Sequence, residues 1–199
     1  MTLKPSYASQ VPISLDVREQ SLLYCELEYH LTGALNNYIA AELEKGHLLP
    51  DNFKKIADAW HQQGRPRVVG FRFDLETQID LVTLHINDFT FYGRRQGNPS
   101  EISGLLHAMK MNSRAMRIRT FCQPDSVVAK QLVDSQALFD MISVPKASQI
   151  ALAEIVQFFK VIVEREQDYQ VQRQQYDEEF ARQAAQVSPS RNSYIGRGA

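Results

Sequence analysis

The sequence contains little cysteine. Only two of its 199 residues are cysteines, Cys25 and Cys122, and neither belongs to a CxxC pair. Two isolated thiols are typical of a reducing compartment, whereas secreted domains usually carry several disulfide-bonded cysteines. We therefore expect a cytoplasmic or nuclear protein that folds around a hydrophobic core without covalent staples.

Long apolar runs and an excess of charge of one sign are also absent. No segment approaches the ~20 apolar residues of a membrane-spanning helix. The first fifteen residues hold one lysine, no arginine and two prolines, a composition unlike that of a signal or transit peptide. The 22 basic and 23 acidic residues leave a formal net charge of -1, so the chain as a whole is not predicted to attract polyanions. We expect no association with membranes.

The common catalytic motifs are missing too. The sequence contains no GxSxG, P-loop, GxGxxG or HExxH. Glu26 and His30 are spaced to share a helix face, but a metal site needs about four ligands and the sequence offers no others near them. We predict no catalytic residue, no metal site and no cofactor, and hence a protein that is not an enzyme. Cys122 or His107 beside a carboxylate from a distant segment would be the exception.

Apolar residues recur at three- and four-residue steps over most of the chain, and this period predicts helices. One helix start is especially clear, because Asn98 can cap a helix, Pro99 fits its first position and Glu101 can complete a capping box. The predicted helices cover approximately residues 15–45, 51–62, 98–116, 128–142 and 147–186.

Residues 67–92 have a different pattern. Phe71 and Phe73 alternate with polar residues, and Phe89 and Phe91 repeat that alternation, which favours strands. The intervening residues 75–86 fit either a strand or a helix. The predicted fold class is therefore α+β and predominantly helical, with about five helices, a small β element near residues 67–92 and a long C-terminal helix.

Composition also predicts how the chain is divided. Residues 1–14 have no apolar period and are expected to form a flexible arm. Residues 15–163 are expected to form a globular helical domain with the small β element. The long helix at 147–186 overlaps the end of that domain, and the polar residues 187–199 are expected to be disordered.

The C-terminal helix carries the clearest functional signal. Its apolar and aromatic residues follow an alternating three-four spacing, which is a heptad seam typical of coiled coils, interrupted by Glu166 and Arg173. Beyond Val163 the sequence is rich in glutamine and charged residues, so nothing nearby in the sequence can bury the distal aromatics. We expect a partner here: a second copy in a homodimer, another protein, or the first long helix folded back. The predicted contact residues are Ile155, Phe159, Ile162, Tyr169, Tyr176 and Phe180.

A basic segment suggests an alternative. Between residues 94 and 130 there are seven lysines or arginines and two acidic residues. A basic stripe on a helix can bind phosphates, but it can equally balance the acidic segment at 15–62. If the stripe binds a polyanion, the predicted contact residues are Arg94, Arg95, Lys110, Arg114 and Arg117.

Two functions are therefore predicted. The preferred one is a non-enzymatic protein-protein interaction or regulatory module that assembles through its C-terminal helix. The alternative is a regulatory protein that binds nucleic acid through the basic stripe. The sequence names neither the partner nor the pathway.

Overall fold

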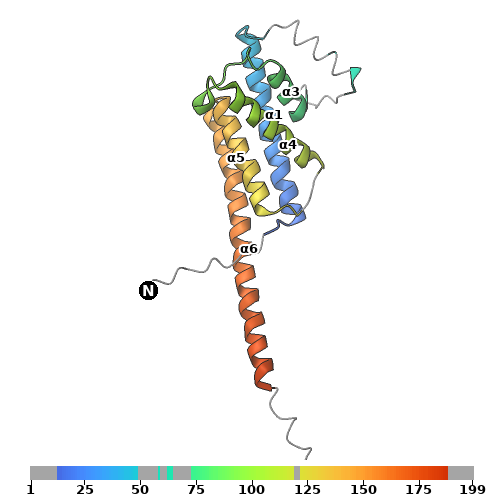
Figure 1. The fold of residues 1–199 in the computed structure, drawn as a ribbon, viewed down its shortest axis with the longest axis vertical. Coiled ribbons are helices and arrows are strands. Elements are labelled where there is room, and N and C mark those ends of the chain that lie inside the picture. Colours follow the sequence, from blue (N-terminus) through green and yellow to red (C-terminus); the bar gives the residue numbers. More distant parts are fainter. Residues whose placement is uncertain (1–12, 49–57, 59–61, 65–72, 119–121, 188–199) are drawn as a thin grey trace, which may run out of the picture.

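The structure consists of helices that surround one core, with one helix extending well beyond it (Figure 1). The computed structural model describes residues 13–48, 58, 62–64, 73–118 and 122–187. Its helices are α1 (Val17–Glu44), α3 (Leu75–Leu84), α4 (Pro99–Ile118), α5 (Asp125–Met141) and α6 (Lys146–Val187), with a short 3-10 turn, η1 (Gly93–Arg95). The prediction of a predominantly helical protein with a long C-terminal helix is confirmed. The helix predicted for 51–62 lies almost wholly outside the described residues.

The helix boundaries follow local chemistry. At the start of α4 the backbone N–H of Glu101 donates to Asn98 Oδ1 at 3.3 Å, so Asn98 caps the helix as predicted. The return bond of the predicted capping box is replaced by a bond between side chains, from Asn98 Nδ2 to Glu101 Oε1 at 2.8 Å, because the Asn98 backbone N–H donates to the carbonyl of Arg95. Asp74 caps α3 by accepting a hydrogen bond from the N–H of Thr77 at 2.7 Å. Gly46 follows the end of α1 with a φ of +78°, the left-handed conformation that glycine adopts without strain.

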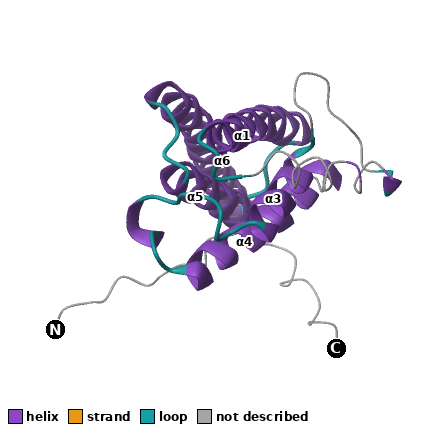
Figure 2. Ribbon diagram, turned by 90° about the horizontal axis from the view of Figure 1, so that it is seen from above, coloured by secondary structure: helices purple, strands orange, loops and turns teal. Residues whose placement is uncertain are grey.

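The predicted β element is wrong for the part that the structure describes. Residues 75–84 form α3, because Leu75, Ile79 and Val82 recur at helical spacing and are all buried. Figure 2 shows helices and loops but no strand among the described residues, in which the only β pairing is a single bridge between Ser14 and Pro124. Residues 67–72 lie outside the described residues.

Phe89 and Phe91, the second predicted strand, lie in an irregular segment between α3 and η1. Both side chains are buried, and the Phe89 ring stacks on Tyr38 of α1 with ring centroids 5.5 Å apart. The backbone donors of this segment bond to other parts of the chain: Tyr92 N–H donates to the carbonyl of Met141 at 2.9 Å. The apolar–polar alternation at Phe89 and Phe91 therefore arises because both rings are buried against α1. The segment does not form a strand.

The core lies between α1, α3, α4, α5 and the first half of α6. Figure 2 views this packing from above, with α1, α5 and α6 adjacent, and contacts join α6 to both α1 and α5. Four side chains of α6 enter the core: Leu152, Ile155, Phe159 and Ile162. Burying a side chain of this size contributes about 1.5–3 kcal/mol, so the first half of α6 is an integral part of the fold.

Parts of the predicted arm and tail fall outside the described residues, namely 1–12 and 188–199. The end of the arm is attached to the body: Ile13 is buried, and its carbonyl accepts a hydrogen bond from the N–H of Asp125 at 2.8 Å. This contact fixes the entry of the chain beside the start of α5.

A buried carboxylate joins the end of α1 to the segment before η1. The side chain of Glu42 is fully buried, and its Oε1 accepts a hydrogen bond from Lys45 Nζ at 2.7 Å. Its Oε2 lies 2.7 Å from Nδ1 of His47 and accepts from the N–H of Thr90 at 3.2 Å. Burial alone raises the pKa of Glu42, but the hydrogen bonds from His47, Lys45 and Thr90 outweigh it and hold the pKa below its ordinary value.

Replacing Glu42 by glutamine should lower the free energy of unfolding at pH 7 by on the order of 1–3 kcal/mol. The amide NH₂ would face groups that are themselves donors, so at least one buried polar group would lose its partner. A carboxyl whose pKa is lower in the folded state stabilises the fold above its unfolded pKa of about 4.3, and this contribution is lost as the pH falls through the folded pKa. The difference between Glu42→Gln and the original chain should therefore shrink on acidification.

Urea unfolding at pH 7 and at a pH below the unfolded pKa measures both effects. Glu44→Gln is the matched control, because Glu44 is an exposed neighbour on the same helix. Equal losses for the two variants, or a Glu42→Gln difference that does not change with pH, would contradict this account of the carboxylate.

Candidate functional site

The second half of α6 leaves the body of the protein (Figure 1). The last ion pair between α6 and the body joins Arg165 to Glu19, in the first turn of α1, through N–O distances of 2.7 and 2.9 Å. These hydrogen bonds, and those to Glu166, raise the pKa of Arg165. Residues 171–186 are all exposed, so this part of α6 has no described neighbour that buries it.

Three aromatic side chains lie on this free half of the helix. Tyr169 is 65% exposed, Tyr176 70% and Phe180 65%. Their spacing of seven and four residues places them on one face, which continues the face that is buried nearer the start of α6. We call Glu166, which is half-buried and bonded to Arg165, together with the exposed residues Tyr169, Arg173, Tyr176 and Phe180, the distal face. One stripe of α6 is thus core in its first half and solvent-exposed in its second.

The six contact residues predicted from the sequence fall into two groups. Ile155, Phe159 and Ile162 are buried in the core of their own chain, to which α1 also contributes. Tyr169, Tyr176 and Phe180 are exposed. Only this second group is accessible to a partner without unfolding, and its partner-binding role stays a prediction.

The basic stripe on α4 lies against α3. Lys110 Nζ contacts Asp80 Oδ1 at 2.6 Å, and Arg114 donates two hydrogen bonds to Glu76 Oε1 at 2.8 and 2.9 Å. Arg117 also bonds to Glu76. Burial raises the pKa of Glu76, but the two guanidinium groups outweigh it and hold the pKa below its ordinary value. The carboxylates that balance the stripe come from α3, and not from the acidic segment 15–62 considered in the sequence analysis.

Arg94 and Arg95 complete the predicted polyanion-binding set. Both lie on η1, and Arg94 is exposed. Among the described residues no carboxylate forms an ion pair with either of them, in contrast to the other three. A phosphate would have to compete with the α3 carboxylates for Lys110, Arg114 and Arg117, which weakens the argument for this surface. Nucleic-acid binding stays a prediction.

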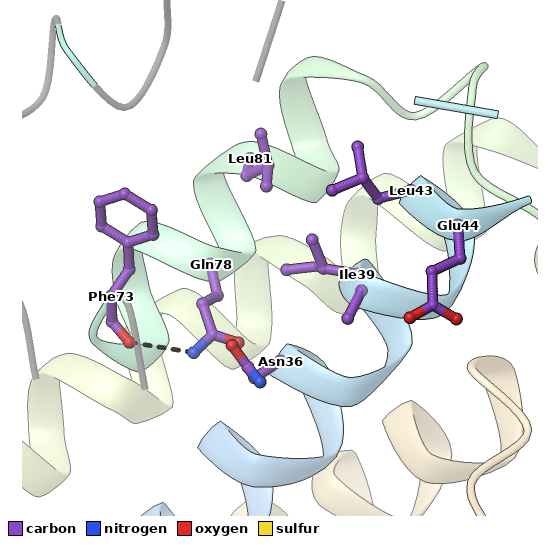
Figure 3. A pocket seen from close by; sticks show the side chains of 8 residues that line it. Asn36, Ile39, Leu43, Glu44, Phe73, Gln78 and Leu81 are labelled. Carbon is purple, nitrogen blue, oxygen red and sulfur yellow. Dashed lines mark hydrogen bonds between the residues drawn. The ribbon is translucent and has the colours of Figure 1, made fainter. Parts of the chain in front are cut away.

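A cavity of about 350 Å³ lies between α1 and α3, and Figure 3 shows the side chains that line it. The lining is mostly apolar, with Ile39, Leu43 and Leu81 among its walls. Gln78 Nε2 donates to the carbonyl of Phe73 at 2.9 Å, while its Oε1 is buried and has no partner among the described residues. The polar groups of the lining are the amides of Asn36 and Gln78 and the carboxylate of Glu44.

A second cavity of about 340 Å³ lies beside Glu42, at the junction of α1, Tyr92 and the loop before α6. The Glu42 carboxylate is already satisfied by three donors, and so it does not present a free base to this space. Cys122 and His107, named above as the catalytic exception, are both exposed and line neither cavity. His30 lies 3.8 Å from Glu26, and the described residues hold no group of three or more potential metal ligands.

Comparison with known protein families, curated proteins and solved structures found no match. None of the helices in the described part of the chain is both long and apolar enough to cross a membrane.

Replacing Glu76 by glutamine should remove the negative charge between Arg114 and Arg117 and replace one of the two acceptor oxygens by a donor NH₂. We expect the free energy of unfolding to fall by up to about 1 kcal/mol at low salt and by less at high salt, because partly exposed ion pairs are screened. The released guanidinium groups should also increase retention on a heparin column. Urea unfolding at two salt concentrations and the elution position measure these effects.

Glu154→Gln controls for the change in net charge, because Glu154 is exposed on α6 and forms no ion pair with a described residue. If both variants shift the heparin elution equally, the α3 carboxylates do not prevent Lys110, Arg114 and Arg117 from binding a polyanion. That result would strengthen the alternative prediction of nucleic-acid binding.

Proposed function

We propose that this chain is a non-enzymatic protein-interaction module that binds a helix of a partner along the distal face of α6. The observation that supports the proposal is the exposure of Tyr169, Tyr176 and Phe180 on one face of a half-helix in which polar residues predominate. Exposed aromatics that share one helix face contribute nothing to the core and are typical of contact surfaces.

The shape of the distal face favours a helical partner. A stripe with three-four spacing is narrow, and it complements the equivalent stripe of another helix through knobs-into-holes packing. Each buried aromatic contributes on the order of 1.5–3 kcal/mol before ordering costs. Because α6 is continuous from the core outward, the body holds one end of the distal helix in place before binding.

The helical body holds the first half of α6 in place and so supports the exposed second half. Leu152, Ile155, Phe159 and Ile162 of α6 are buried in the core. The Arg165–Glu19 pair holds the point at which the helix emerges. The helical body therefore fixes the direction in which the second half of α6, with its distal face, projects. The proposed mechanism is presentation of a recognition helix by a helical body.

Site-specific photo-crosslinking in the cells that make the protein tests the proposal. We expect a benzophenone amino acid at Tyr176, on the distal face, to form discrete crosslinked species with a protein partner. The same group at Glu178, two residues away on another face of the exposed helix, should form few or none.

The two positions have similar exposure, so the comparison isolates the face of the helix. Equal crosslinking from both positions, or none from Tyr176, would contradict a specific contact on the distal face. The mass of the crosslinked species then shows whether the partner is another protein or a second copy.

A further inference from the structure

We propose that the partner on the distal face is a second copy of this chain, paired antiparallel so that Arg173 of each copy packs against Tyr176 of the other. This inference rests on the proposed function, because it names the partner of the same face. Two charged residues, Glu166 and Arg173, interrupt the seam and distinguish the possible pairings.

Parallel pairing brings like charges together. In a parallel, in-register pair of identical helices each seam residue faces its own counterpart. Glu166 would face Glu166, although Arg165 of the same helix lies 2.7 Å from each Glu166 carboxylate and offsets its charge. Arg173 would face Arg173, and this layer would enclose two like charges. Such juxtaposition strongly disfavours an interface. Among the described residues no carboxylate forms an ion pair with Arg173, so no ion pair in the described part of the chain offsets that repulsion.

Antiparallel pairing removes this like-charge layer. With Arg173 opposite Tyr176, the same register places Tyr169 opposite Phe180 and Glu166 opposite Gln183 of the second copy. A guanidinium group over a tyrosine ring is a favourable cation–π contact, and the tyrosine–phenylalanine layers are aromatic pairs. The glutamine amide can donate to the glutamate carboxylate. Twofold symmetry repeats each layer, so every member of the distal face has a complementary neighbour.

The length of the free helix fits this register. All the layers lie between residues 166 and 183, beyond the Arg165–Glu19 contact, so the body does not need to rearrange. The next layer would require Ile162, which is already buried in its own core, and the pairing therefore ends where the body begins. The result is a closed, twofold interface with the two bodies at opposite ends.

Arg173→Gln in the full chain tests the register, with sedimentation equilibrium as the measurement. The antiparallel arrangement predicts a dimer Kd raised about tenfold, because two Arg–Tyr contacts are lost. A parallel arrangement predicts a lower Kd, because the variant removes a like-charge layer. Arg182→Gln is the matched control: it makes the same charge change off the distal face, where Arg182 pairs with Glu178 of its own helix, and it should leave the Kd unchanged.

Spin labels at Gln186 give an independent readout of orientation, in a chain with Cys25→Ser and Cys122→Ser because both cysteines are exposed. The antiparallel register offsets the two labels by about 23 residues, or roughly 35 Å along the axis at ~1.5 Å per residue. A parallel pair places them side by side, about 10 Å between helix axes.

The outcomes separate the two proposals. An unchanged or lower Kd for Arg173→Gln, or labels side by side, overturns the antiparallel register. A full-length chain that stays monomeric at the highest attainable concentration overturns self-pairing altogether. In that case crosslinking from Tyr176 to a different protein would still support the proposed function, whereas its absence would end both.

Discussion

The packing of the first half of α6 against α1 is the interaction on which the rest of the structure depends. Ile155, Phe159 and Ile162 are buried there, so the position and direction of α6 are set by the core. Because α1 begins at Val17, its cover ends near the contact between Glu19 and Arg165. The helix continues beyond that contact with the same three-four spacing. Because α6 is longer than α1, the first half of its seam is buried in the core. The second half is exposed and is the candidate interface.

The sequence was sufficient for most of the helices and insufficient for the segment around α3. Periodicity and the Asn98–Glu101 capping pair located α1, α4, α5 and α6 to within a few residues. The alternating aromatics misled the prediction, because burial against α1 produces the same alternation as a strand. What distinguishes the two is the destination of the backbone hydrogen bonds, here the Glu42 carboxylate and the Met141 carbonyl, and both are far away in the sequence.

The sequence located the candidate site on the C-terminal helix. It could not tell which of the predicted contact residues are buried in the core and which are exposed. The change of composition after Val163 did mark the place where the seam leaves the core, but spacing alone gave no reason to separate Phe159 from Tyr176. The basic stripe was visible, whereas its neutralisation by Glu76 was not, because the sequence does not say which helix packs beside α4. Glu42 gave no signal at all: a glutamate near a helix end is usually exposed, and only the fold shows that it is buried.

Light scattering over a range of concentrations, on the full chain and on a chain ending at Gln167, shows whether the free half of α6 mediates assembly. The shorter chain keeps the buried half of α6 and the contact between Arg165 and Glu19. The account predicts that the full chain approaches twice its 22.8 kDa mass as the concentration rises, while the shorter chain stays at the mass of one copy. Identical behaviour of the two chains would contradict the claim that the free half of α6 is where this protein assembles.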